Sequence, residues 1–332
     1  MIRHQNLDFK TGERLQQEIK WLLEAKYQGS VTEDAKLDIE RLREGEPIDY
    51  VIGQAEFCSC QIDLSMRPLI PRAITEFWTY KAIAEIEKLC RSKTRCLDIF
   101  AGSGCVGVAI LKHLPYAAVD FADIDQKFLD QVKINLNLNG IHDDRSRIIR
   151  SDIFANISDR YDFIFANPPY IPLGAAVKKI SLRYEPHHTF FSGEDGFLHI
   201  RPFLEQARNH LLPEGQIWLE YAPGLRIKLE KILRDAGYDN FIFFDSKDCP
   251  GEFAVIFPSA ARKLDPFFHF FGSDRLDVNH DAPEWKVVPY KEYLRSRQVN
   301  LPKPAALGGA LSLGYILKKR KSERNFSDAV LS

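Results

Sequence analysis

The chain has 332 residues, of which 45% are hydrophobic and 27% are charged, so it is long enough for two or three domains and has the composition of a globular protein. Its formal net charge of −1 excludes a chain-wide electrostatic grip on nucleic acid, which needs a basic excess. Six cysteines without a CxxC pair predict neither a disulfide scaffold nor a metal site.

Residues 1–20 contain no apolar leader, and no apolar run in the chain approaches the roughly 20 residues that span a bilayer. We therefore expect a cytoplasmic protein without a membrane partner. The charge is distributed unevenly, because residues 259–332 carry 13 basic and 8 acidic residues, a net charge of +5, which leaves −6 on residues 1–258.

The first part of the chain predicts helices followed by a hairpin. Apolar residues recur at helical spacing over 12–43, with a break at 30–32, and Gly45-Glu46-Pro47 ends this helical stretch. Two extended runs, at 50–57 and 61–64, flank a short turn and predict a β-hairpin.

Further along, short apolar runs alternate with helical stretches. The apolar runs lie at 96–100, 118–122, 148–149, 163–166, 216–221, 241–244 and 253–257, and the helical stretches at about 73–90, 105–114, 126–139, 198–212 and 223–236. Strands that alternate with helices form parallel βαβ units. The gap between the last two runs is too short for a crossover helix, so these two strands should pair antiparallel. The pattern predicts an α/β domain with a seven-stranded, mostly parallel sheet whose last strand is antiparallel.

These patterns divide the chain into four expected segments: a helical N-terminal domain, a β-hairpin linker, the α/β domain, and a mildly basic C-terminal extension of unassigned role. Their expected bounds are 1–48, 49–70, 71–258 and 259–332.

A glycine loop follows the first strand of the α/β domain. Gly102, Gly104 and Gly107 match GxGxxG, and Asp123 ends the next strand. Glycines let the backbone approach a ligand, and the carboxylate accepts hydrogen bonds from ribose hydroxyls, so the loop predicts a dinucleotide or S-adenosylmethionine site. Asp98 favours S-adenosylmethionine, because a carboxylate there suits the methionine ammonium and would repel a pyrophosphate. If the loop bound a dinucleotide instead, the GxGxxG match would indicate a dehydrogenase, which is the alternative function.

The motif Asn167-Pro168-Pro169-Tyr170 follows the fourth strand. A planar NH2 group is a poor nucleophile, and the Asn167 side-chain carbonyl and the Pro168 backbone carbonyl can each accept one of its N–H bonds. That arrangement aims the nitrogen at an electrophilic methyl group while the Tyr170 ring packs on the flat face of the target. The two prolines stiffen the loop. The motif therefore predicts methylation of an amide or of a base amino group.

Together these motifs resemble the bacterial protein-(glutamine-N5) methyltransferases known as PrmC or HemK, over about 41–257. The blocks that carry the resemblance are Gly45-Glu46-Pro47 through Gly53, Leu69-Ile70-Pro71-Arg72 through Glu76, Asn167 through Tyr170, Glu185-Pro186 with Gly193-Glu194-Asp195-Gly196, and Leu212 through Glu220. The resemblance implies a Rossmann-like methyltransferase fold with S-adenosylmethionine as methyl donor. It also implies N5-methylation of the glutamine in the GGQ motif of class-I peptide chain release factors, which act in translation termination.

The resemblance also implies site residues. The cofactor-binding set is Asp98, Phe100, Ala101, Gly102, Ser103, Gly104, Asp123, Asp152, Ile153 and Asn167, and the catalytic set is Asn167, Pro168, Pro169 and Tyr170, with no metal. Asp123 would be the ribose ligand, and Ile153, next to Asp152, would lie beside the adenine. The helical N-terminal domain would recognise the protein substrate. Phe100 and Ala101 stand where the family has Gly and Thr.

Three alternatives to the release factor remain open. The first is glutamine methylation of a ribosomal protein. The second is methylation of adenine N6 or guanine N2 in nucleic acid, against which the charge of −6 on residues 1–258 argues, so we do not expect direct nucleic-acid binding. The third is an idle S-adenosylmethionine-binding partner protein, against which the complete Asn167–Tyr170 motif argues. We interpret His187-His188 as part of a surface loop, because adjacent residues on an extended segment point to opposite sides.

Overall fold

The computed structural model describes residues 12–89, 93–142, 144–175, 183–245 and 252–258. All of these residues belong to one unit of the chain. The C-terminal extension expected at 259–332 lies outside the described residues.

The chain begins with a small helical unit of α1 (Gly12–Tyr27), α2 (Glu33–Arg43) and α3 (Ile48–Ile52). The helices predicted over 12–43 and the break between them are confirmed. The Thr32 side chain caps α2 by accepting a hydrogen bond of 3.1 Å from the Ala35 backbone N–H. The apolar faces of the three helices meet in a core of their own, formed by Leu22, Ile39, Leu42 and Val51.

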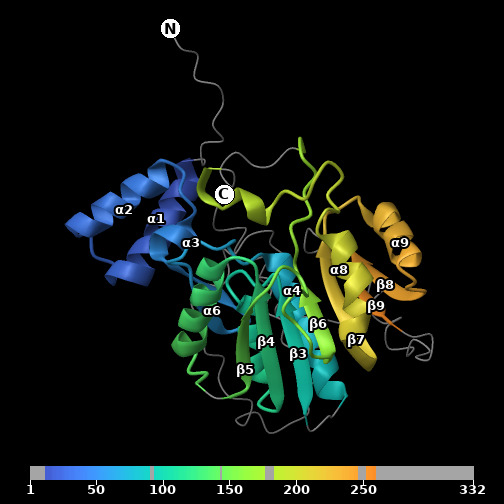
Figure 1. Cartoon of the computed structure of the whole chain (residues 1–332). Coiled ribbons are helices and arrows are strands. Elements are labelled where there is room, and N and C mark those ends of the chain that lie inside the picture. Colours follow the sequence, from blue (N-terminus) through green and yellow to red (C-terminus); the bar gives the residue numbers. More distant parts are fainter. Residues whose placement is uncertain (1–11, 90–92, 143, 176–182, 246–251, 259–332) are drawn as a thin grey trace, which may run out of the picture. The chain divides into compact units, whose positions relative to one another are not determined.

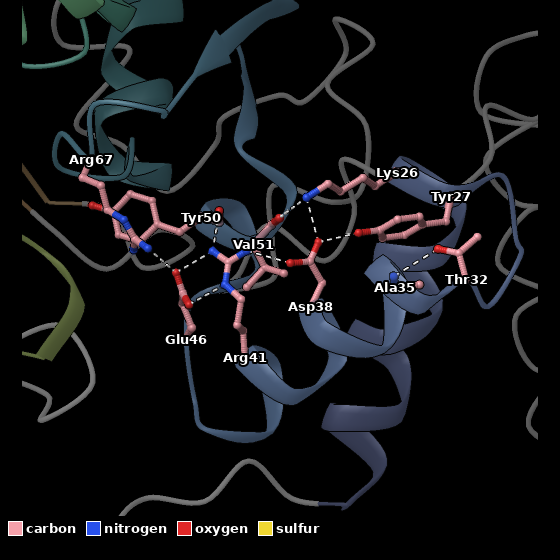
Figure 2. A network of polar contacts seen from close by, with 10 residues as sticks. All are labelled: Lys26, Tyr27, Thr32, Ala35, Asp38, Arg41, Glu46, Tyr50, Val51 and Arg67. Carbon is pink, nitrogen blue, oxygen red and sulfur yellow. Dashed lines mark hydrogen bonds and ion pairs between the residues drawn. The ribbon is translucent and has the colours of Figure 1, made fainter.

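A polar network ties this helical unit to the segment that follows it (Figure 2). The buried carboxylate of Asp38 accepts hydrogen bonds of 2.7 Å from three donors, Lys26 Nζ, the Tyr27 hydroxyl and Arg41 Nη1. Glu46 binds Arg41 and, at 2.6 Å, Arg67. Burial alone would raise the pKa of the Asp38 and Glu46 carboxyls, but the hydrogen bonds outweigh it and hold both pKa values below their ordinary range.

The hairpin consists of β1 (Gln54–Phe57) and β2 (Cys60–Asp63), which pair antiparallel. Its prediction is confirmed, but the extended run expected from residue 50 is wrong at its start, because α3 occupies Ile48–Ile52. Pro47 precedes this helix with φ at −57°, and Gly53 ends it with φ at +90°, where glycine is unstrained. The residues at the two ends of α3 therefore determine a helix where the apolar pattern alone predicted a strand.

Seven strands form the main sheet in the order β5-β4-β3-β6-β7-β9-β8. They are β3 (Thr94–Ile99), β4 (Ala117–Asp123), β5 (Ser146–Arg150), β6 (Tyr161–Ala166), β7 (Leu211–Tyr221), β8 (Asn240–Asp245) and β9 (Glu252–Phe257). β9 pairs antiparallel with both β7 and β8, and the pairs among β5, β4, β3, β6 and β7 are parallel. The predicted seven-stranded sheet with an antiparallel last strand is confirmed, and this is the Rossmann-like methyltransferase architecture.

Helices cover both faces of this sheet (Figure 1). Alternate residues of each strand face opposite sides, so Phe163 and Phe165 of β6 join one apolar core while Ile164 joins the other. The first core is completed by α4 (Ala73–Lys88), α5 (Cys105–His113) and α6 (Gln126–Leu138), and the second by α8 (Ile200–Ala207) and α9 (Arg226–Asp235).

The helix expected over 198–212 ends earlier than predicted. α8 stops at Ala207, a single 3-10 turn follows at Arg208–His210, and β7 already begins at Leu211. Leu211 pairs with Tyr161 of β6. Pro213 has no N–H for a helical hydrogen bond, so the apolar pair before it extends the strand rather than the helix.

The order of the strands places a switch point at β3, whose neighbours are β4 on one side and β6 on the other. Chain connections leave in opposite directions from the carboxyl ends of these strands, and in open α/β sheets this is the edge at which ligands bind. The glycine loop follows β3, Asp123 is the last residue of β4, and the motif that begins at Asn167 follows β6. The fold therefore brings the predicted site residues to one edge.

Candidate functional site

The glycine loop connects β3 to α5. A Cβ atom on Gly102 would meet nothing nearer than the Phe100 carbonyl oxygen at 4.0 Å, so the backbone there borders open space. A Cβ atom on Gly104 would lie 2.9 Å from Val132 Cγ2, and one on Gly107 would lie 2.2 Å from Phe121 Cε1. Gly102 therefore leaves room for a ligand, whereas the other two glycines let α5 pack closely on its neighbours.

Phe100 adopts a left-handed backbone with φ at +60°. This conformation costs a non-glycine residue about 1–3 kcal/mol. The ring makes an edge-to-face contact with Phe203 of α8 at a centroid distance of 5.9 Å, which offsets part of that cost. The position at which the resemblance expects glycine is thus one where glycine would be unstrained.

Hydrogen bonds to β4 and α6 hold the next residues of the loop. The Ala101 N–H donates to the Ala122 carbonyl at 3.1 Å, which joins the loop to the end of β4. Ser103 is buried, and its carbonyl accepts a hydrogen bond of 2.8 Å from Asn135 of α6. The loop is therefore fixed before any ligand arrives, so little conformational entropy remains to be lost on binding.

Asp123 ends β4 beside the loop. Its Oδ2 accepts the Gly102 N–H and its Oδ1 accepts the Asp125 N–H, each at 2.9 Å. Burial raises the pKa of this carboxyl, although the two backbone hydrogen bonds oppose the rise. Each carboxylate oxygen has capacity for a second hydrogen bond, so the residue can still accept two hydroxyl donors.

Two apolar residues, Ile124 and Ile153, come just after the ends of β4 and β5. Ile124 is 56% exposed, and Ile153 is half-buried with φ at +48°. The ends of β4 and β5 are adjacent, because the Ser151 N–H donates to the Asp123 carbonyl at 3.0 Å. Asp152, between Ser151 and Ile153, is exposed. Sequence reasoning missed Ile124, and the detectable signal was a large apolar residue directly after the strand-end carboxylate.

Asp98 lies deeper than the other acidic residues. It is 4% exposed, and its Oδ2 accepts the Gly107 N–H at 2.9 Å. Burial raises the pKa of this carboxyl to about 8, and the charge of Asp123 adds to the rise. A cation placed near Asp98 would reverse this shift, because it would favour the ionised form.

Asn167 follows β6, all six residues of which are buried. Its Nδ2 donates to Thr75 Oγ1 at 3.2 Å, and Thr75 in turn donates to Glu220 Oε2 at 2.7 Å. Glu220 Oε2 also accepts the Trp78 indole N–H at 2.8 Å, and Glu220 Oε1 accepts the Tyr170 hydroxyl at 2.9 Å. One buried carboxylate thus holds both polar ends of the motif.

The two prolines of the motif lie between these anchors, with Pro168 buried and Pro169 half-buried. Gly196 packs against the motif, since a Cβ atom there would lie 2.5 Å from the Tyr170 carbonyl oxygen. Its φ of +85° also favours glycine. Close packing against Tyr170 therefore requires glycine at position 196.

The segment after the motif is anchored by an ion pair. The Arg72 guanidinium donates to both oxygens of the buried Glu185 carboxylate at 2.7 and 2.8 Å, and the Ile70 N–H donates to the same group at 3.1 Å. His188 stacks on Phe128 at a centroid distance of 5.5 Å. The part of the chain that the structure describes contains no group of three or more His, Cys, Asp or Glu side chains that could hold a metal ion.

The structure thus brings the predicted loop, Asp123, Asp152, Ile153 and the motif starting at Asn167 to neighbouring strand ends; their roles toward a ligand stay predictions. It also adds Thr75, Trp78 and Glu220, which sequence reasoning did not connect with the site. The available signal was a charged residue, Glu220, within an otherwise apolar run of β7. None of the described helices combines the length and the apolar character that a membrane span requires.

The sequence is similar to that of known methyltransferases. The family model "Methyltransferase small domain" matches residues 83–183. The chain is 34% identical over 195 residues to the release factor glutamine methyltransferase of Streptococcus pneumoniae, covering 57% of this chain and 68% of that protein. It is 30% identical over 218 residues to the release factor glutamine methyltransferase of Buchnera aphidicola, covering 64% and 75%.

The ribosomal protein L11 methylase of Lactobacillus delbrueckii superposes with a TM-score of 0.42 at 17% identity, covering 59% of this chain and 82% of that one. The 16S rRNA N2 G1207 methyltransferase of Thermus thermophilus, in complex with AdoMet and guanosine, superposes with a TM-score of 0.44 at 18% identity, covering 61% and 49%.

Proposed function

Because this chain belongs to the family of release factor glutamine methyltransferases, we propose that it methylates N5 of the glutamine side chain in the GGQ motif of a class-I peptide chain release factor. The chain is a methyltransferase by family, and S-adenosylmethionine is the methyl donor that we propose for it. The release factor is the proposed protein partner, and the cytoplasm, where translation terminates, is the proposed location.

The orientation of the Asn167 side chain is the observation that carries the proposal. Its Nδ2 is engaged by Thr75, which leaves Oδ1 to accept a hydrogen bond from a substrate. An amide NH2 group has two N–H donors, and Asn167 Oδ1 together with the Pro168 carbonyl offers two acceptors. Tyr170, fixed through its hydroxyl, presents its ring to the flat face of the same amide.

These residues supply positioning rather than proton transfer. Holding both N–H bonds of the substrate amide aims its nitrogen along one line of attack, and such positioning accounts for a large part of many enzymatic rate accelerations. When bound, S-adenosylmethionine supplies an electrophilic methyl group. The bond between nitrogen and the methyl group would form as the bond between the methyl group and the donor's sulfur breaks, and the nitrogen becomes cationic. Its proton is then acidic enough to pass to water, so no strong base on the protein is needed.

The residues at the strand ends fit this donor. The backbone at Gly102 borders open space, and both oxygens of Asp123 retain acceptor capacity for ribose hydroxyls. Ile124 and Ile153 would lie against the adenine, with Asp152 beside them. The carboxylate of Asp98 would face the ammonium of the methionine part, directly or through water.

The helical unit is the part of the chain that we propose for recognising the release factor, with 1–48 as that domain, 49–70 as its linker and 71–258 as the methyltransferase domain. The ion pair between Arg67 and Glu46 joins the end of the proposed domain to its linker, just before the block that starts at Leu69. A rigid connection would hold a bound protein at a fixed distance from Asn167.

The substrate can be tested by competition. The purified protein is incubated with methyl-labelled S-adenosylmethionine and a mixture of release factor, ribosomes and bare RNA, and the label is traced by mass spectrometry. We expect the label on the release factor, at a rate lowered by about 100-fold or more with the Asn167→Ala variant. Label on a ribosomal protein or on RNA would contradict the assignment of the release factor as substrate. Cofactor binding without any label would indicate an idle binding protein.

A further inference from the structure

We propose that Glu220 is a positioning residue that fixes the orientation of the Asn167 side-chain amide through the hydroxyl of Thr75. The proposal deepens the function given above and rests on it, because Asn167 Oδ1 is the group that receives the substrate amide there. In this role Glu220 acts on the substrate only through Thr75 and Asn167.

The direction of each hydrogen bond follows from the chemistry of the groups. Burial raises the pKa of the Glu220 carboxyl, and the hydrogen bonds from Thr75, Trp78 and Tyr170 oppose that rise because they stabilise the ionised form. The ionised carboxylate only accepts, and the indole N–H of Trp78 only donates, so both Trp78 and Thr75 donate to Glu220 Oε2, at 2.8 and 2.7 Å. Thr75 has a single hydroxyl proton, and Glu220 uses it. The Thr75 oxygen therefore faces Asn167 with lone pairs only.

That leaves one stable orientation for the Asn167 amide. If the side chain were flipped, Asn167 Oδ1 would meet the lone pairs of Thr75 Oγ1 at the 3.2 Å that Nδ2 occupies, and two acceptors would repel each other. With Nδ2 toward Thr75, Oδ1 points away from the network. The carboxylate thus dictates, through one intermediate hydroxyl, which end of the amide the site presents.

Burial strengthens this series of hydrogen bonds. Thr75 is 2%, Trp78 1% and Glu220 1% exposed, so water does not compete for any of the three. Hydrogen bonds that share a buried, charged terminus polarise one another. A more polar Asn167 carbonyl would stabilise the positive charge that develops on the methylated nitrogen, as preorganised dipoles do in other enzymes.

The same carboxylate holds the second functional group of the motif. Tyr170 donates to Glu220 Oε1 at 2.9 Å, so the ring that covers the substrate amide and the amide that receives it share one anchor. Thr75 and Trp78 come from α4, and Glu220 comes from β7. Three segments far apart in the sequence therefore converge on the orientation of a single side chain.

The test uses one substitution at two positions of one helix. Thr75→Val removes the hydroxyl between Glu220 and Asn167. Thr79→Val removes an equally buried hydroxyl one turn away, whose only role among the described residues is a 2.7 Å hydrogen bond to the Thr75 carbonyl. We expect Thr75→Val to lower kcat by about 10–100-fold, as misplacement of a positioned group does, with the KM for S-adenosylmethionine within about twofold.

Thr75→Ser keeps the hydroxyl, so it should retain kcat within about threefold of the wild-type value, and Thr79→Val should do the same. A kcat for Thr75→Val that equals that of Thr79→Val would overturn the proposal. So would a loss in Thr75→Ser as large as that in Thr75→Val, because it would show a packing effect rather than a hydrogen-bond effect.

A second readout does not depend on the substrate. In protein labelled with 15N-asparagine, one proton of the Asn167 NH2 group should exchange slowly because it is bonded to Thr75, and this protection should disappear in Thr75→Val but persist in Thr79→Val. Unchanged protection in Thr75→Val would overturn the proposal. If the wild-type protein leaves the release factor unmethylated, the proposed function fails, while the exchange measurement still decides whether Thr75 orients Asn167.

Discussion

Replacing Gly107 by alanine tests the close packing of the glycine loop on the sheet. The added Cβ would lie 2.2 Å from Phe121 Cε1, 2.6 Å from Phe121 Cζ and 2.9 Å from Val119 Cγ1. Ordinary carbon contacts lie at about 3.5–4.0 Å, so the methyl group overlaps Phe121 Cε1 by more than about one ångström and its other two neighbours by less. Phe121 and Val119 are both fully buried in β4, so neither side chain has space into which to turn.

The expected cost follows from two opposing terms. Overpacking a rigid core costs about 1–3 kcal/mol and occasionally more, whereas alanine in a helix interior gains about 1 kcal/mol over glycine. The overlap is severe, so we expect Gly107→Ala to lower the free energy of unfolding by about 2 kcal/mol. Urea denaturation followed by circular dichroism measures this. A value within about 0.5 kcal/mol of wild type, the scatter typical of neutral surface substitutions, would refute the reasoning.

Gly102→Ala is the matched comparison within the same loop. Its Cβ would meet no atom nearer than 4.0 Å, so only the left-handed backbone, with φ at +54°, opposes it. That strain costs about 1–2 kcal/mol. Because this methyl group would project into the open space assigned to the donor, cofactor affinity should fall more than for Gly107→Ala. Calorimetric titration with S-adenosylmethionine distinguishes the two variants, and equal affinities would show that Gly102 does not border the ligand.

Three further predictions address the chemistry. Asn167→Ala should lower kcat by about 100-fold or more while cofactor binding weakens less; full turnover in a steady-state assay would eliminate the assigned role. Asp123→Ala should mainly raise the KM for S-adenosylmethionine, because it removes the acceptor for the ribose hydroxyls, and an unchanged KM would reject that assignment. Burial raises the pKa of Asp98 to about 8 from an ordinary 3.8. The folded protein therefore binds this proton more tightly than the unfolded chain does. As a result, the free energy of unfolding should fall as the pH rises from about 4 to 8. Asp98→Asn cannot ionise and should lose less stability over that interval in urea titrations at several pH values; a pH dependence identical to that of wild type would contradict the burial of this carboxyl.

The sheet was predictable because each strand is a short apolar run between recognisable helices. The eight residues between the last two runs were enough to predict their antiparallel pairing, since a crossover connection needs more chain. The two misplaced boundaries, at α3 and at the end of α8, lie where Pro47, Gly53 and Pro213 set the local conformation. In both places single residues with restricted or unusual backbone angles outweighed the apolar pattern around them.

The motif residues of the site were predictable from the sequence because each lies at the end of a strand. The residues that anchor the motif were not predictable, since Glu220 lies 145 residues from Thr75 in sequence and 50 residues from Tyr170. A hydrogen bond between such distant positions leaves no local periodicity. The backbone conformation of Phe100 was equally hidden, because it depends on how the loop turns from β3 into α5 rather than on the side chain itself.

The position of the transferred methyl group tests the central claim most directly. A release factor methylated by this protein would be digested, and the peptide that carries the GGQ motif would be sequenced by tandem mass spectrometry beside a release factor whose GGQ glutamine is replaced by alanine. The account predicts a single methyl group on the side-chain nitrogen of that glutamine and none on the alanine variant. A methyl group on any other residue, or one that persists in the alanine variant, would contradict it.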